Sequence, residues 1–193
     1  MIDPRKLQTK LGVTVDGIVG VGTFTALFRK CGASAERAAD LAVCAARWFA
    51  EYGVMASERR LAHFLAQLIH ESGSFRYMEE VASGEAYEGR TSLGNTQPGD
   101  GKRYKGRGPI QITGRANYRT FGRKIGIDLE SNPTLAAVPS IGLLLALEYW
   151  RDRVLNALAD ADDIEGITRR INGGLNGFAD RKAQLAKVKS WIQ

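Results

Sequence analysis

Apolar residues recur every three or four positions along most of the chain, which is the period of an amphipathic helix. The sharpest stripe follows Ser57, a residue type that caps helix N-termini, and a long helix is predicted to begin at Pro139. The stripes consist of Leu41, Ala45, Trp48 and Phe49; of Leu61, Phe64, Leu65, Leu68 and Ile69; of Tyr118, Phe121 and Ile125; of Leu143, Leu144, Leu147 and Trp150; of Ile164, Ile167 and Ile171; and of Leu185, Val188, Trp191 and Ile192. Strand-like alternation is scarce, so the pattern predicts a mostly α fold.

The beginning of the chain has a pattern of its own, with two short helices. Asp3-Pro4 is typical of an N-cap followed by proline at the first helical position. Asp16-Gly17 indicates a turn before a second helix that stops at Gly32. We therefore expect a short helical segment at 1–32 and a main domain at 33–193. About thirty residues are too few for an independent core, so the segment is expected to lean on the main domain.

Composition narrows the class of protein. The chain has 193 residues, of which 44% are hydrophobic and 25% charged, enough for one medium-sized domain with an ordinary core. The longest apolar stretches, such as residues 141–147, fall short of the ~20 residues of a membrane helix, so no stable membrane insertion is expected. The N-terminus has no apolar signal segment, which predicts synthesis in the cytoplasm. The two cysteines make no disulfide framework, and Cys44 is predicted to be a core residue.

The net charge of +6 is compatible with nucleic acid, an anionic membrane or an anionic wall polymer. The basic residues are dispersed, however, and no dense Lys/Arg tract occurs. Nucleic-acid binding therefore rests on the net charge alone and is not expected.

Glu71 is the strongest candidate for a catalytic acid. An apolar stripe ends at Ile69 and Gly73 is placed to stop the helix, so Glu71 is predicted in the last turn. The negative end of the helix dipole disfavours a carboxylate there by about 0.3–1 kcal/mol, and burial against Phe75 or other aromatic residues would disfavour it further. Both effects keep a carboxyl group protonated near neutral pH, as a general acid requires. The alternative is an ordinary solvated glutamate at a helix end.

Metal and thiol chemistry are weakly supported. The zinc-peptidase pattern needs a second histidine four residues after His70, where the chain has Ser74. His63 lies on the other side of His70 in the chain, and no third ligand is identified. Neither cysteine has neighbours that would activate a thiolate. We therefore expect no metal and no cofactor.

A glycosidase needs a second carboxylate across the bond that it cuts, about 6.5–9.5 Å from the acid in an inverting enzyme. The stretch from residue 83 to 108 is polar, rich in glycine and without clear periodicity. A loop there could face Glu71 across a cleft. The carboxylates in or beside it are Glu79, Glu80, Glu85 and Glu88. Spacing alone does not choose among them.

Residues 106–118 are expected to bind a sugar. Gly106 and Gly108 allow close approach of the backbone, while Ile110 and Ile112 are placed to anchor the segment in the core. Neutral polar side chains and an aromatic ring are then left for the ligand, namely Gln111, Thr113, Asn117 and Tyr118. The segment lacks the Gly-Lys-Ser/Thr ending of a phosphate loop, so nucleotide binding is not expected. A purely structural turn is the alternative.

Several motifs occur together and in a fixed order. They are His70-Glu71-Ser72-Gly73, Tyr87-Glu88-Gly89-Arg90, Leu93-Gly94-Asn95, Gly99-Asp100-Gly101, the stretch 104–115, Asn117-Tyr118, and Ile171-Asn172-Gly173-Gly174 with Arg181. This series, over roughly residues 35–193, resembles glycoside hydrolase family 19, and more closely the phage endolysin branch of that chitinase-like family. The string that runs from Leu7-Gln8 to Gly20 resembles one repeat of the peptidoglycan-binding modules of wall hydrolases.

The resemblance implies a mostly α, two-lobed, lysozyme-like fold with a central substrate cleft. It makes Glu71 the general acid and Glu80 the general base, with Glu88 as the alternative base, and Thr113 the residue that helps to hold the attacking water. Positions that match substrate contacts of the family, or lie in its motifs, are Tyr87, Arg90, Gln111, Asn117, Tyr118, Asn172 and Arg181. Arg181 or Arg90 would also hold the general base ionised.

Together these features predict an endolysin that hydrolyses the β-1,4 bonds of peptidoglycan by inversion for host cell lysis. Such an enzyme is made in the host cytoplasm, reaches the periplasmic wall through a lesion made by a holin-type membrane protein, and is expected to be a monomer. A chitinase acting on N-acetylglucosamine polymers is the alternative enzyme. A non-catalytic wall-binding module is the alternative from another class.

Overall fold

Helices form where the apolar stripes predict them. The computed structural model describes residues 2–192. Its α-helices are α1 (Pro4–Leu11), α2 (Val21–Lys30), α3 (Ala35–Trp48), α4 (Glu58–Glu71), α5 (Asp100–Arg103), α6 (Arg115–Ile125), α7 (Pro139–Asp152), α8 (Leu155–Asp160), α9 (Ile164–Asn172) and α10 (Phe178–Ile192). Short 3-10 turns are η1 (Val54–Ala56), η2 (Glu85–Tyr87), η3 (Thr91–Leu93) and η4 (Pro133–Ala137). Within this part of the chain, strand-like pairing is limited to the isolated bridges Glu79–Arg107 and Arg107–Ile112. The prediction of a mostly α fold is confirmed.

The helix ends follow the local chemistry that the sequence predicts. The Asp3 side chain accepts hydrogen bonds from the first turn of α1, which Pro4 opens. Ser57 caps α4 in the same way, through the backbone N–H of Arg60. Gly126 ends α6 with a φ of 73°, in the left-handed region that glycine adopts without steric cost.

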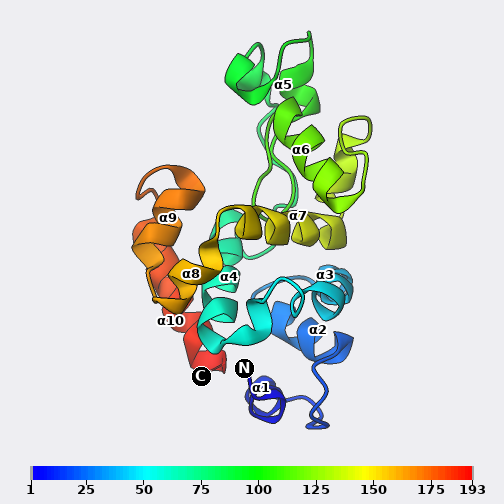
Figure 1. Cartoon of the computed structure of the whole chain (residues 1–193). Helices are drawn as coiled ribbons and strands as arrows, with labels where there is room; N and C mark the ends of the chain where they lie inside the picture. The colour runs from blue at the N-terminus through cyan, green and yellow to red at the C-terminus, as the bar shows by residue number, and fades with distance from the viewer. Residues whose placement is uncertain (1, 193) are drawn as a thin grey trace.

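The elements are arranged in two lobes around α7 (Figure 1). Helix α7 crosses the middle of the molecule, with α5 and α6 on one side of it and α1, α2 and α3 on the other. Helix α4 forms the centre of the larger lobe, and every residue from Leu61 to Ile69 in it is buried. Its Phe64 ring meets Phe49 of the loop after α3 and Trp150 of α7 edge to face, at centroid distances of 5.6 and 5.2 Å. This packing fixes the end of α4, where Glu71 lies.

The first 32 residues share the hydrophobic core of the rest of the chain. Leu27 and Phe28 of α2 are fully buried in it. The Phe28 ring lies 6.2 Å from the Phe49 ring and 5.4 Å from the Phe75 ring, both centroid to centroid. The core is therefore continuous across the expected boundary at residue 32. Wall binding by this segment stays a prediction.

Cys31 and Cys44 are both buried free thiols, which confirms Cys44 as a core residue. Burial raises the pKa of each thiol to about 12. From residue 2 to residue 192, no helix is both long and apolar enough to cross a membrane.

Candidate active site

A cavity of about 290 Å³ opens between the two lobes. The C-terminal end of α4, the segment before α6, and the ends of α7 and α9 meet around it. Its lining residues are Glu71, Leu93, Ile110, Gln111, Ile112, Thr113, Asn117, Tyr149, Arg153, Ile171 and Asn172. Five of the residues expected at the site are among them, although they come from segments far apart in the chain.

Glu71 is the last residue of α4. Beyond it, the chain turns sharply because the Ser72 hydroxyl donates to the carbonyl oxygen of Leu68 and accepts from the N–H of Phe75. The Glu71 side chain is 20% exposed, and its Oε1 accepts a hydrogen bond of 2.5 Å from Nη2 of Arg181 on α10. Glu71 is thus held at the cavity wall by a buried cation.

Further contacts join the C-terminal end of α4 to the first turn of α10. Arg181 also donates to Oε1 of the buried Gln67, one turn before Glu71. Next to it, Nδ1 of His70 lies 2.6 Å from Oδ2 of Asp180. Neighbouring residues of α4 are therefore tied to neighbouring residues of α10, which limits the motion of the Glu71 backbone.

Two expectations about this corner are wrong. Phe75 does not shield Glu71, since its ring packs against Phe28 in the core. Instead of an apolar surface, the Glu71 carboxylate meets the guanidinium of Arg181. Arg181 was expected to contact substrate or to hold the general base, but its side chain is 2% exposed and its ionic partner is Glu71.

Glu80 is held at a fixed orientation by the smaller lobe. Its Oε1 accepts a 3.0 Å hydrogen bond from the Tyr87 hydroxyl, and its Oε2 accepts one of 3.1 Å from the N–H of Gly106. Its backbone N–H donates to the Gly106 carbonyl oxygen. Burial, together with the hydrogen bond to Glu80, raises the pKa of Tyr87, so the phenol stays a neutral donor.

Glu80 and two cavity residues converge on Gly106. A Cβ atom added to Gly106 would lie 2.7 Å from Gln111 Oε1, 3.2 Å from Glu80 Oε2 and 3.3 Å from Thr113 Oγ1. Only glycine leaves room for this approach, as the sequence predicts. Because Gln111 and Thr113 also line the cavity with Glu71, they border both carboxylates.

The other candidate carboxylates are engaged in the structure of the loop. Glu79 pairs with Lys105 and Arg107. Burial raises the pKa of Glu79, but the hydrogen bond from Lys105 and the charge of Arg107 outweigh it, and the net shift is downward. Glu85 forms an exposed pair with Lys102.

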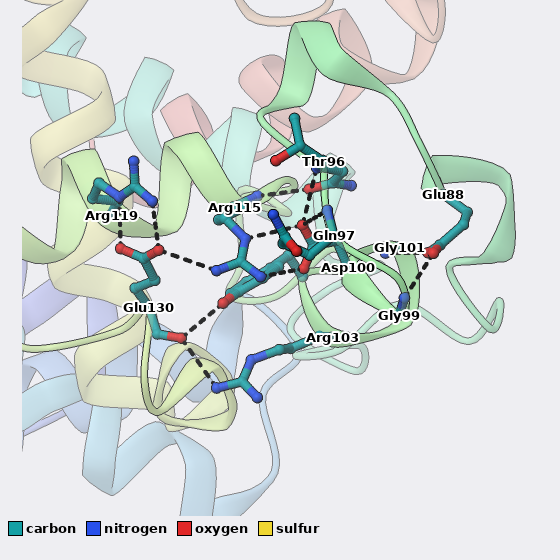
Figure 2. Close-up of polar contacts among 12 residues, drawn as sticks. Glu88, Thr96, Gln97, Gly99, Asp100, Gly101, Arg103, Arg115, Arg119 and Glu130 are labelled. Atoms are coloured by element: carbon teal, nitrogen blue, oxygen red, sulfur yellow. Dashed lines mark hydrogen bonds and ion pairs between the residues drawn. The ribbon is translucent and has the colours of Figure 1, made fainter.

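Glu88 has both carboxylate oxygens occupied by backbone donors. Oε1 accepts from the N–H of Gly99 at 2.6 Å, and Oε2 accepts from the N–H of Gly101 at 2.8 Å. Figure 2 shows Glu88 next to these two glycines at the start of α5. Neither Glu88 nor Glu80 is among the residues that line the cavity with Glu71, but Glu80 approaches Gln111 and Thr113 of its wall at Gly106.

The polar side chains of the cavity wall retain hydrogen-bonding capacity for a ligand. Thr113 Oγ1 donates to the carbonyl oxygen of Gln111 at 2.9 Å, which leaves its lone pairs to accept. The Asn117 amide donates to the carbonyl oxygen of Thr113. Asn172 braces the turn after α9 through Asn176 and Gly174. Ile110 and Ile112 are buried, as predicted for anchors of this segment.

Tyr118 and Arg90 differ from their expected roles. Tyr118 is fully buried, and its hydroxyl donates to the Lys105 carbonyl oxygen and accepts from Arg107. Burial raises the pKa of Tyr118 to about 12. The expected substrate contact of Tyr118 is therefore wrong. The exposed Arg90 guanidinium lies 5.6 Å from the centroid of the Tyr87 ring rather than beside a carboxylate, so Arg90 does not hold the base.

The two histidines lie apart, each with its own aspartate. Nε2 of His63 is 2.6 Å from Oδ1 of Asp162, whereas His70 pairs with Asp180. Across residues 2–192, no group of three or more His, Cys, Asp or Glu side chains is arranged to hold a metal ion.

Sequence analysis missed Tyr149 and Arg153 in the cavity wall. The Arg153 guanidinium lies 3.4 Å from the centroid of the Tyr149 ring. Burial raises the pKa of Tyr149, while the charges of Arg153, Glu71 and Arg181 also act on it. The spacing of four residues on one helix predicts their mutual contact. No local pattern in the sequence indicates that Tyr149 and Arg153 lie near Glu71.

Comparison with known proteins agrees with this architecture. Residues 26–164 match the glycoside hydrolase 19 family model, described as chitinase class I. An endochitinase of Arabidopsis thaliana is 36% identical over 166 residues, which cover 83% of this chain and 57% of the plant protein. A glycosyl hydrolase family 19 domain-containing protein of Haemophilus influenzae is 34% identical over 151 residues, covering 62% of this chain and 74% of that protein.

Solved structures show the same fold. Chitinase C from Streptomyces griseus has a TM-score of 0.68 at 24% identity, with 90% of this chain and 92% of that chain covered. The class IV chitinase from Zea mays has a TM-score of 0.66, again at 24% identity, with 90% of each chain covered. The lysozyme-like fold expected from the sequence is confirmed.

The family match covers well over half of the chain. This protein therefore belongs to glycoside hydrolase family 19. Its match spans 57% of the length of the Arabidopsis endochitinase.

Proposed function

We propose that this protein hydrolyses the β-1,4 glycosidic bonds of bacterial peptidoglycan by an inverting mechanism. Glu71 is the general acid that protonates the leaving oxygen. Glu80 is the general base that removes a proton from the attacking water. The observation that carries the proposal is that Gln111 and Thr113 border both carboxylates, which is where a sugar and a water molecule must lie between the two groups.

Glu71 needs its proton only when a glycan is bound. In the free protein, the Glu71 side chain accepts a hydrogen bond from Arg181. A bound sugar chain displaces water from the cavity, and this desolvation favours the neutral acid. Arg181 then holds the carboxyl group toward the glycosidic oxygen without contacting the substrate itself.

Glu80 is suited to act on a water molecule because two neutral donors hold its carboxylate in a fixed orientation. These are the Tyr87 hydroxyl and the Gly106 N–H. Thr113 accepts a hydrogen bond from the water, and its own proton is directed to the Gln111 carbonyl oxygen. The engagement of both Glu88 oxygens with backbone N–H groups favours Glu80 over Glu88 as the base.

The charge of the cavity favours peptidoglycan over chitin. Arg153 lines the cavity, and within the described chain it makes no ion pair with a carboxylate. Chitin is neutral, whereas the glycan of peptidoglycan bears a lactyl group and a peptide with carboxylates. A guanidinium at the cavity wall complements such a substituent.

Chitin hydrolysis is the second candidate, because several relatives of this chain are named chitinases. The proposal includes a role as an endolysin. In this role the protein depends on a holin-type partner, acts in the periplasm and works as a monomer. This role rests on the lysin-like motifs of the sequence.

Mass spectrometry of the products tests the proposal. Purified peptidoglycan and colloidal chitin are each treated with wild-type protein, Glu71→Gln and Glu80→Gln. We expect wall fragments with a new reducing N-acetylmuramic acid end from the wild type and their loss in both variants. Release from chitin alone would assign the second candidate. Cut peptides on intact glycan would overturn the glycosidase assignment, and loss in Glu71→Gln alone would move the base to Glu88.

A further inference from the structure

Asn95 and Asp100 are buried polar residues of the segment between η3 and α6, and Asp100 is the first residue of α5. Asn95 is fully buried, and the Asp100 side chain is 2% exposed. Burying polar groups without hydrogen bonds is costly. The hydrogen-bond partners of these two residues therefore show which parts of the structure they hold in place. Both side chains are closed off from solvent, so a direct contact with substrate is not their role.

Asp100 fixes the loop to the first residue of α6. Its carboxylate binds Arg115 through both oxygens, with Nε donating to Oδ2 at 2.9 Å. Oδ2 also accepts from the backbone N–H groups of Thr96 and Gln97. Arg115 is held from its other side by Glu130, at 3.3 Å. Figure 2 shows Arg115 between the two carboxylates.

Asn95 connects this cluster to the neighbour of the proposed base. Its Oδ1 accepts a 2.9 Å hydrogen bond from the N–H of Arg115, and its Nδ2 donates to the carbonyl oxygen of Tyr87 at 2.9 Å. The Tyr87 hydroxyl in turn donates to Glu80. A continuous series of hydrogen bonds thus runs from Asp100 to Glu80.

Tyr87 needs this anchor because packing does not hold it. It belongs to η2, in which no residue is buried. Gly84 and Gly89 on its two sides have positive φ values of 86° and 66°. A short exposed turn of this kind is mobile unless polar contacts restrain it. A catalytic group must be held to within about 0.5 Å of its working position, so the restraint on Tyr87 is decisive for Glu80.

We propose that Asn95, fixed by Arg115 and Asp100, is a positioning residue that holds Tyr87 against Glu80. The inference rests on the proposed role of Glu80 as general base. Asn95 holds Tyr87 by its backbone carbonyl oxygen, and Tyr87 in turn holds Glu80 through its hydroxyl. The orientation of Glu80 thereby depends on a cluster of charged residues that lies outside the cavity.

The charged groups around Glu80 define the background for a pH measurement. Lys105 Nζ donates to the Glu80 backbone carbonyl oxygen at 3.0 Å and also pairs with Glu79. The other ionisable groups facing this corner are Arg107, which pairs with Glu79, Tyr118, which Arg107 contacts, and Arg90, which lies over the Tyr87 ring. None of them is altered in the variants below.

A double-mutant cycle with pH–activity profiles tests the inference. Tyr87→Phe removes only the donor hydroxyl. Asn95→Asp keeps the acceptor for the Arg115 N–H but loses the donor to Tyr87. We expect each to lower kcat about 10-fold with little change in KM, and to move the acidic limb of the profile to higher pH, because the carboxylate loses a stabilising donor. The double variant should match Tyr87→Phe, since Asn95 acts through Tyr87.

Matched variants separate positioning from general damage to the fold. Glu85→Gln removes an exposed ion pair from the same turn and should leave kcat and the pH profile unchanged. If Asn95→Asp lowers the melting temperature, Asp100→Asn provides a second way to loosen the cluster. Multiplicative losses in the double variant, or lower activity with an unshifted profile, would overturn the positioning role.

Glu80→Gln distinguishes this inference from the proposed function. If Glu80→Gln is inactive while Tyr87→Phe has the wild-type pH profile, only the positioning role fails. If Glu80→Gln keeps wild-type activity, Glu80 is not the base, and the inference falls together with that assignment.

Discussion

Arg181 Nη2 lies 2.5 Å from Glu71 Oε1, although the two residues are 110 positions apart in the chain. The pair joins the last residue of α4 to the first turn of α10. It is a charge-assisted hydrogen bond in which the arginine is almost fully buried and the glutamate faces the cavity. Arg181 thus fixes the orientation of the Glu71 side chain at the cavity wall.

Replacing Glu71 and replacing Arg181 should have different effects on activity and stability. Glu71→Gln keeps an oxygen that accepts from Arg181, so we expect a similar melting temperature and at least ~100-fold lower kcat. Arg181→Met leaves Glu71 and Gln67 without their donor and should lower the free energy of unfolding by about 3 kcal/mol. Urea unfolding and release of reducing ends measure the two effects. Full activity of Glu71→Gln would contradict its role as the acid.

Gly106→Ala should reduce activity more than stability. The added Cβ would meet Gln111, Glu80 and Thr113 at 2.7–3.3 Å, which forces side chains next to the reacting groups to shift. Displacements of this kind cost on the order of 100-fold in kcat. Gly22→Ala is the matched control, because nothing lies within 4 Å of its Cβ position in α2. Equal kcat values for the two variants would refute the importance of this close approach.

The shared core predicts that the first 32 residues unfold together with the rest of the chain. Phe28→Ala should lower the free energy of unfolding by about 3–5 kcal/mol, since Phe28 is fully buried against Phe49 and Phe75. Ile18→Ala, at a residue that is 71% exposed, should change it by less than ~0.5 kcal/mol. Calorimetry should show one transition in both variants. A separate early transition in Phe28→Ala would indicate an independent N-terminal unit.

The ion pairs at Glu130 predict a loss of stability in acid. The hydrogen bond from Arg119, with a further one from Arg115, lowers the pKa of Glu130 from 4.5 to about 2. Because the folded-state pKa is the lower one, this stabilisation is complete above about pH 4.5 and is lost as the pH falls toward 2. Unfolding by urea across this range should therefore show a weaker pH dependence in Glu130→Gln than in the wild type. Parallel curves would refute the contribution of Glu130.

Arg153 should distinguish the two glycans. Arg153→Gln removes the cation from the cavity wall, and we expect about a 10-fold lower kcat/KM on peptidoglycan fragments, as a charge-assisted hydrogen bond of roughly 1.5 kcal/mol implies. Activity on neutral N-acetylglucosamine oligomers, where the wild type shows it, should stay the same. Equal losses on both substrates would mean that Arg153 only supports Tyr149, which it stacks on.

Local chemistry was sufficient to predict most of the helices and the position of Glu71. Apolar periodicity, the cap at Ser57 and the proline at position 139 act over a few neighbouring residues, so their effect can be inferred without the rest of the chain. The anchoring of residues 106–118 by Ile110 and Ile112 has the same local origin. Gln111, Thr113 and Asn117 of this segment line the cavity, whereas Tyr118 is buried.

Long-range packing determined the partners of the polar groups. Tyr118 follows the cavity residues in sequence, yet its ring turns into the core, where Lys105 and Arg107 satisfy its hydroxyl. The Glu88 oxygens accept from the backbone N–H groups of Gly99 and Gly101, more than ten positions away in the chain. Arg181 could have paired with either carboxylate, because sequence separation does not restrict which charges the fold brings together. Such contacts depend on how whole helices pack, and no local pattern of residues encodes that geometry.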